Sequence, residues 1–213
     1  MKIAVIGATG WIGGTTVGEL LQRGHSVTAI ARDPSKITTR HAALAVVRAD
    51  LRDAASIAKA VGRHDAVIAS VASRKDGIPG FHVATAKLLL DILPRAGVNR
   101  FLWVGGAGSL LVAPNMRLVD TPDFPAMYKA EALAQADALE VFRESQSPVD
   151  WVFLSPAAMI APGKRHGKYR TGGDRLITNE KGESIISVED FAVAIADEIE
   201  KPKHHRARFA VAY

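Results

Sequence analysis

The sequence has no cysteine among its 213 residues, which excludes disulfides, thiolate metal sites and cysteine nucleophiles together. It also has no apolar stretch approaching the roughly 18 residues of a membrane span. The apolar run that begins at Ile3 stops at Gly7, with no cleavage-type segment behind it. We therefore expect a cytoplasmic protein without a membrane partner.

An excess of one charge is small as well. The 27 Lys and Arg residues outnumber the 22 Asp and Glu residues by five, and apart from a short stretch from Lys201 they are scattered, which does not indicate a nucleic-acid surface. His204 and His205 do not predict a metal site, because adjacent side chains point apart and no third ligand suggests itself; we expect them to be exposed. With 48% hydrophobic and 23% charged residues, the composition is globular, and the length predicts one domain over residues 1–213.

Short apolar runs, often β-branched, alternate with segments of helical spacing through the first two thirds of the chain. The runs are typical of strands covered on both faces. They are Ile3–Ile6, Val27–Ile30, Leu44–Val47, Ala66–Val71, Phe101–Val104 and Trp151–Leu154. The helical segments lie at 12–21, 57–61, 81–92 and 130–142. The alternation predicts an α/β fold, a doubly wound parallel sheet with helices on both sides in three layers.

After Leu154 the pattern changes, and residues 155–188 form a variable segment rich in Gly and Pro. We expect this segment to belong to a small C-terminal extension on the substrate side of the fold. We expect a short strand pair, 175–178 with 183–186. The basic loop at 163–173 either covers the site, meets an anionic substrate or is simply solvated. Ser187 and Asp190 are spaced as a capping box before a helix over 189–200, and Phe209–Tyr213 is the last expected strand.

A glycine-rich loop follows the first predicted strand and opens the first predicted helix. In the motif Gly7-Ala8-Thr9-Gly10-Trp11-Ile12-Gly13, Gly7 permits a tight turn, Gly10 lets backbone approach a pyrophosphate, and Gly13 lets helix and strand pack closely. Free N–H groups at the helix start favour phosphate. The alternative is that these glycines only make a turn.

The spacing Gly-x-x-Gly-x-x-Gly resembles the short-chain dehydrogenase/reductase superfamily, in its extended and atypical branches, where NmrA-like, biliverdin-reductase-B-like and epimerase-like proteins belong. Further motifs carry the resemblance over nearly the whole chain: Arg32-Asp33-Pro34, Asp50-Leu51-Arg52-Asp53, Gly105 to Ser109, Leu154 to Ala157, Pro162-Gly163 and Ile186 to Asp190. It implies a Rossmann fold with Gly7, Thr9, Gly10, Trp11, Ile12 and Gly13 at the cofactor.

Arg32, after the second strand, stands near the position where a carboxylate would accept from the ribose of NAD. A guanidinium binds a 2′-phosphate in a fork, so NADP (NADPH) is the expected cofactor. The alternative is that Arg32 is a solvated cation and Asp33 serves NAD.

Other strand ends supply further cofactor contacts. Related proteins place a carboxylate and an apolar residue against adenine where this chain has Asp50 and Leu51, although Asp50 is equally suited to cap the next helix. Backbone at Ser70, Val71 and Ala72 is expected to line the crevice, unless Ser70 and Ser73 are only small polar strand-end residues. By resemblance, the backbone of Pro156 and Ala157 meets the nicotinamide; the alternative is a plain turn.

The superfamily transfers a proton through a Tyr-x-x-x-Lys pair assisted by a serine. This chain has the serine, Ser109, and the tyrosine, Tyr128, as candidate catalytic residues, but Ala132 stands where the lysine belongs, and Lys129 lies about 100° around the helix. Three accounts stay open: Tyr128 acts alone or with water, the acceptor needs little protein acid, or nucleotide binds without turnover. Ser109 is otherwise a helix cap, and Tyr128 an ordinary helix residue.

The sequence thus favours an NADPH-dependent oxidoreductase acting on a small conjugated acceptor: a flavin, quinone, enone or carbonyl compound. One alternative is an NmrA-like redox sensor without turnover. The other is an epimerase or dehydratase, for which the roughly sixty residues after the sixth strand offer little material. The expected partner is a small-molecule substrate; monomer and dimer stay open.

Overall fold

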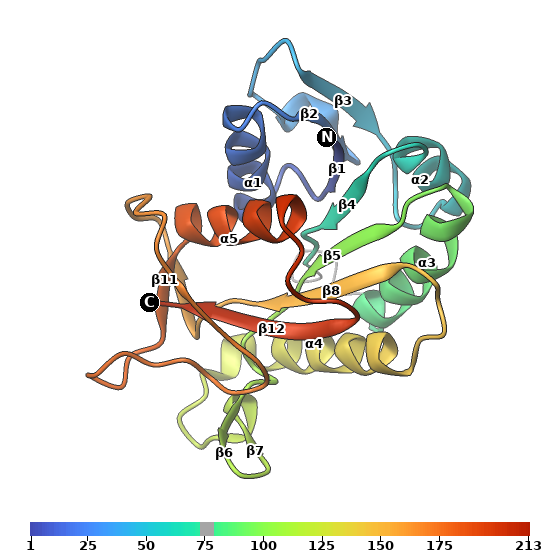
Figure 1. Cartoon of the computed structure of the whole chain (residues 1–213). Helices are drawn as coiled ribbons and strands as arrows, with labels where there is room; N and C mark the ends of the chain where they lie inside the picture. Colours follow the sequence, from blue (N-terminus) through green and yellow to red (C-terminus); the bar gives the residue numbers. More distant parts are fainter. Residues whose placement is uncertain (73–78) are drawn as a thin grey trace.

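The computed structural model describes residues 1–72 and 79–213, and its centre is an eight-stranded sheet with helices on both faces (Figure 1). The strand order is β10-β12-β8-β5-β4-β1-β2-β3, and every neighbouring pair is parallel except β10 with β12. This confirms the predicted α/β fold with a doubly wound, mostly parallel sheet. None of the helices in the described ranges is both long enough and apolar enough to cross a membrane.

The strands and helices follow the predicted alternation. The main sheet contains β1 (Lys2–Ile6), β2 (Ser26–Ala31), β3 (Leu44–Arg48), β4 (Ala66–Ala69), β5 (Arg100–Val104), β8 (Asp150–Ser155), β10 (Arg170–Gly172) and β12 (Ala207–Ala212). Two small sheets pair β6 (Leu111–Ala113) with β7 (Met116–Arg117), and β9 (Met159–Ala161) with β11 (Ile185–Ser187). The helices are α1 (Trp11–Gln22), α2 (Ala54–Val61), α3 (Phe81–Arg95), α4 (Ala126–Glu144) and α5 (Val188–Glu200), with 3-10 turns η1 (Pro34–Lys36) and η2 (Leu118–Asp120).

Two apolar cores, one on each face of the sheet, explain why the strands are continuously hydrophobic. In β1, Ile3 and Val5 join the core under α1 and α5, whereas Ala4 and Ile6 join the core under α2, α3 and α4. Successive side chains of a strand point to opposite faces, so a strand buried on both sides needs an apolar residue at each position. Figure 1 shows these two helical layers.

Several short elements of the fold differ from the sequence prediction. The strand pair 175–178 with 183–186 is wrong: β11 pairs in parallel with the distant β9, and Arg175 forms an isolated bridge to Leu111. A turn closes at Asn179, whose N–H donates to the carbonyl of Glu183. The strand β10 and the β6–β7 hairpin were not predicted, because segments of two or three residues have no usable periodicity.

The sheet topology determines where a site can lie. Six adjacent parallel strands, β3, β2, β1, β4, β5 and β8, end at one edge of the sheet. Ligands of open α/β sheets bind beyond this carboxyl edge, where the strand order reverses. The segments that follow these six strands therefore carry the candidate site.

Candidate functional site

The glycine loop packs directly against the end of β4. Gly7 has φ +83°, and a Cβ on it would lie 1.9 Å from the carbonyl oxygen of Ser70. A Cβ on Gly13 would lie 2.3 Å from the carbonyl oxygen of Gly7. The turn at Gly7 and the close helix–strand packing at Gly13 are therefore both present, and neither position accepts a side chain without movement of the backbone.

Helix α1 begins with its first amides uncapped. Gly10 is the N-cap, in extended conformation, and it provides no side-chain hydrogen bond; the first turn contains no acidic residue. Thr9, Gly10 and Trp11 are exposed, and Ile12 is partly buried against the core. Free amides and the positive end of a helix dipole attract phosphate, so these residues fit a dinucleotide diphosphate.

Arg32 and Asp33 follow the end of β2, where they have different roles. The Asp33 carboxylate caps η1: it accepts from Ser35 N at 3.2 Å and Ser35 Oγ at 2.6 Å, and it lies 3.5 Å from Lys36 Nζ. These contacts lower the pKa of Asp33, and the hydrogen bond from the Ser35 hydroxyl has the largest effect. Arg32 is exposed at this edge.

Asp50, after β3, binds the side chain of Arg52 rather than capping α2. Arg52 Nη2 and Nε lie 2.6 and 3.0 Å from its carboxylate oxygens. These hydrogen bonds lower the pKa of Asp50 to about 2, and the positive charge of Arg32 adds a smaller effect. The cap of α2 is instead Asp53, which accepts from Ala55 N and Ser56 N, so the capping alternative for Asp50 is wrong.

The remaining cofactor candidates also lie at the carboxyl edge. Ser70 donates its N–H to the carbonyl of Ile6, and Val71 and Ala72 continue past the end of β4. Leu51 is partly buried against the core beneath α2. Pro156 and Ala157 directly follow β8 and are buried. Ser73 lies outside the described residues.

Ser109 contacts a buried arginine that the sequence analysis did not select. The chain continues from Ser109 into β6 without starting a helix, so the helix-cap alternative is wrong. The Ser109 and Ser155 hydroxyl oxygens each lie 3.5 Å from Nη1 of Arg208, whose Nε lies 2.6 Å from Asp174 Oδ1. The signal for Arg208 was its place within the apolar strand 207–212.

Tyr128 lies in the first turn of α4, with 42% of its surface exposed. Ala132 stands where its expected lysine partner belongs. Ala132 is buried, and a Cβ built on Gly108 would lie 2.6 Å from the Cβ of Ala132. Helix α4 and the loop after β5 are thus in close contact at the position where the superfamily has its lysine.

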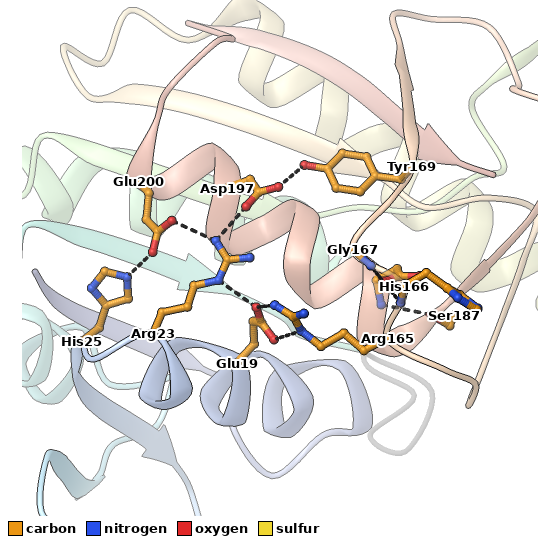
Figure 2. A network of polar contacts seen from close by, with 11 residues as sticks. Glu19, Arg23, His25, Arg165, His166, Gly167, Tyr169, Ser187, Asp197 and Glu200 are labelled. Carbon is orange, nitrogen blue, oxygen red and sulfur yellow. Dashed lines mark hydrogen bonds and ion pairs between the residues drawn. The ribbon is translucent and has the colours of Figure 1, made fainter.

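The basic segment 163–173 is not simply solvated, because polar contacts attach it to two helices (Figure 2). Arg165 binds Glu19 of α1 through Nη2 and Nε at 2.7 and 2.8 Å. The backbone N–H groups of His166 and Gly167 donate to the Asp190 carboxylate of α5 at 2.8 and 2.7 Å. The N–H of Asp190 donates to Ser187 Oγ at 3.0 Å, which is the N-cap of α5 that the sequence predicted.

The same network joins α1 to α5. Arg23 lies 2.7 Å from Asp197 and 2.8 Å from Glu200, and Tyr169 donates its hydroxyl to Asp197 at 2.6 Å (Figure 2). Burial, and then the Asp197 carboxylate, raise the pKa of Tyr169. The variable segment is therefore anchored both to α1, whose first amides are the candidate diphosphate contacts, and to α5.

The side chains of His204 and His205 contact different partners, but of the two only His205 is exposed, whereas the sequence predicted exposure for both. His204 is partly buried, stacks on Phe209 with ring centroids 4.0 Å apart, and lies 2.9 Å from Glu198. His205 lies 2.8 Å from Asp150. No group of three or more His, Asp or Glu in the described part of the chain is arranged to hold a metal ion.

Comparisons with known proteins agree with this geometry. YwnB of Bacillus subtilis (strain 168) is 41% identical over 99% of this chain and 98% of its own length. A solved structure from Bacteroides thetaiotaomicron, described as a candidate epimerase, is 40% identical with a TM-score of 0.91, covering 100% of this chain and 96% of that one. One from Streptococcus pneumoniae, described as a candidate NADH-flavin reductase, is 37% identical with a TM-score of 0.88, covering 100% and 99%.

A family model described as NAD(P)H-binding matches residues 7–202, which begin at the first glycine of the loop and extend past α5. The match covers far more than half of the chain, and the α/β fold of the chain and its similarity to the solved structures agree with it. This protein belongs to the NAD(P)H-binding family.

Proposed function

We propose that this protein is an NADPH-dependent oxidoreductase that reduces a small conjugated acceptor. The observation that carries the proposal is the glycine loop, pressed against Ser70 beside the uncapped start of α1, at the same sheet edge as Ser109. When bound there, the dinucleotide supplies a hydride. The residues of the chain bind and orient the two reactants and exclude water.

The preference for the phosphorylated dinucleotide rests on Arg32. The carboxylate of Asp33, the group suited to a ribose hydroxyl of NAD, is occupied in capping η1. An exposed guanidinium beside it offers a fork for a 2′-phosphate. The streptococcal relative is named for NADH, so both dinucleotides belong in the test.

Calorimetry with NADPH and NADH tests this preference. We expect Arg32→Ala to weaken NADPH binding about tenfold to a hundredfold, the loss of a charge-assisted hydrogen bond, and to leave NADH binding unchanged. Arg95→Ala, which removes the same charge at the far end of α3, is the matched control. Equal affinities for both dinucleotides, unaltered in Arg32→Ala, would contradict the preference.

Exposed apolar side chains support a flat, apolar acceptor. Trp11 opens α1, Met127 lies in the first turn of α4, and Met159 begins β9 just after β8; they are 47%, 77% and 62% exposed. Aromatic and Met side chains suit planar ligands. The name of the streptococcal relative, an NADH-flavin reductase, agrees with such an acceptor.

The assay follows absorbance at the reduced-nicotinamide band, with NADPH and a panel of flavins, quinones, enones and aldehydes. Decay that depends on the acceptor supports the oxidoreductase. The second candidate is a nucleotide sensor without turnover, favoured by the presence of Ala132, packed against Gly108, where the superfamily has its lysine. Tight NADPH binding with no decay across the panel would establish the sensor instead.

A further inference from the structure

Arg208 is a buried cation whose guanidinium is divided between two kinds of partner. Its side chain is only 3% exposed. The Nε and Nη2 groups bind the carboxylate of Asp174, at 2.6 and 2.5 Å, and Nη2 also lies 3.4 Å from the Asp174 carbonyl. The third nitrogen, Nη1, lies 3.5 Å from each of the Ser109 and Ser155 hydroxyl oxygens.

This placement is costly, and the ion pair does not fully explain it. Asp174 is 53% exposed and also binds Arg143, at 2.9 Å from its Nη2. An exposed carboxylate needs no buried partner, and an arginine in a strand buried on both faces loses hydration. Burial lowers the pKa of Arg208, with Asp174 opposing that effect. An ion pair that served only stability could form at the surface, as the pair between Arg143 and Asp174 does.

The contacts with the two serines indicate what the buried guanidinium does. A guanidinium only donates hydrogen bonds, so each hydroxyl oxygen accepts from Nη1 and must direct its own O–H elsewhere. No acceptor for the proton of either hydroxyl is found in residues 1–72 and 79–213. Ser155 is fully buried, whereas Ser109 is partly exposed at the carboxyl edge. The Ser109 hydroxyl is therefore a donor with a free direction toward a ligand.

We propose that Arg208 is a positioning residue that fixes Ser109 as a hydrogen-bond donor to the carbonyl oxygen of the acceptor, which makes conjugated carbonyl compounds the substrate class. The inference rests on the oxidoreductase function proposed above. Addition of a hydride brings two electrons and one hydrogen nucleus to the carbon framework and leaves one negative charge on the carbonyl oxygen. Ser109 stabilises that oxygen until a proton from solvent water neutralises it.

The first test uses infrared spectroscopy and needs no turnover. The probe is 1,4-naphthoquinone labelled with ¹³C at its carbonyl carbons, added to full-length protein with NADP⁺, which cannot reduce it. A hydrogen bond from Ser109 lowers the carbonyl stretching frequency of the bound probe. We expect this downshift in the wild type and in Arg143→Gln, and its loss in Ser109→Ala, Arg208→Gln and Arg208→Lys.

The second test measures reduction of the same quinone by NADPH. We expect Arg208→Gln to lower kcat about tenfold to a hundredfold with little change in KM, because the interaction strengthens as charge develops on the oxygen. Arg208→Lys keeps a cation against Asp174, which preserves folding, but its compact ammonium lacks the planar fork that reaches Asp174 and the two serines together, so it is expected to lose kcat similarly. Arg143→Gln, the matched control, leaves kcat unchanged.

A double-mutant comparison separates positioning from a structural effect. If Arg208 acts through Ser109, the variant with Arg208→Lys and Ser109→Ala together is no slower than Ser109→Ala alone. If the double variant lost kcat by the product of the two single losses, the inference would be overturned. It would also be overturned if the bound probe had the same carbonyl frequency in the wild type and in Ser109→Ala, or if no band of bound probe were seen. A downshift that depends on Arg208, with no quinone reduction, would uphold the inference and refute the oxidoreductase.

Discussion

Adding one methyl group to Gly13 perturbs the candidate dinucleotide site without introducing backbone strain, because Gly13 lies within the helix α1 and not in the left-handed region. The new Cβ would lie 2.3 Å from the carbonyl oxygen of Gly7 and 2.9 Å from its carbonyl carbon. Ordinary contact begins near 3.4 Å, so α1 and the loop must separate by about 1 Å.

That displacement allows the magnitude to be worked out. Overpacking of this kind costs about 1–3 kcal/mol. Alanine is favoured over glycine in a helix by about 1 kcal/mol, which offsets part of the cost. We expect Gly13→Ala to lower the free energy of unfolding by about 1 kcal/mol and, because the first amides of α1 move, to weaken NADPH binding at least about tenfold.

Gly14→Ala is the control, since its Cβ would meet the Ala8 carbonyl oxygen at an acceptable 3.4 Å. It gains the helix propensity without the collision and is expected to be neutral or stabilising. Urea unfolding and calorimetry with NADPH measure the two effects. If Gly13→Ala matched Gly14→Ala in stability and bound NADPH like the wild type, the close packing of loop and helix would control neither the free energy of unfolding nor NADPH affinity.

Three further changes test other parts of the structure. Ala132→Lys is expected to lower the free energy of unfolding by about 1–3 kcal/mol, because it enlarges a buried side chain that is packed against Gly108, and to give no faster acceptor reduction; a faster enzyme would contradict the packing argument. Asp53→Ala should cost about 1 kcal/mol in urea unfolding, the value of an N-cap, and no loss would disprove that cap. The hydrogen bond from Arg165, opposed by burial, holds the pKa of Glu19 below its ordinary 4.5, so the stability from this pair is present above that value and is lost as pH falls through the folded pKa. Arg165→Ala should therefore be about 1 kcal/mol less stable than wild type at pH 7 and nearly equal to it in strong acid, and a difference independent of pH would refute the pairing.

The parallel sheet was predictable because its inner strands are buried on both faces and leave continuous apolar runs. The glycine loop was predictable because it needs glycine at Gly7 and Gly13 for steric reasons that act within the loop and its neighbouring strand. Both signals are local, or repeat along the chain, so they can be recognised without the fold.

Long-range contacts were not predictable. The strand β11 pairs with β9, and nothing in the residues between them marks that choice over the nearer 175–178. The sequence placed Arg208 in the short cationic stretch that begins at Lys201, although it alone of that stretch falls inside an apolar strand. The role of Arg165 in the basic loop stayed open, because its partner Glu19 lies 146 positions earlier.

The position of β12 has a consequence for how this chain is made. This strand follows both β8 and β10 in sequence, yet it lies between them in the sheet. A nascent chain on the ribosome therefore presents β8 as an unpaired strand edge until β12 has emerged, and until then β10 has no neighbour to join. Unpaired strand edges promote association between chains, so the nascent chain is most vulnerable to aggregation in the interval between the emergence of β8 and that of β12.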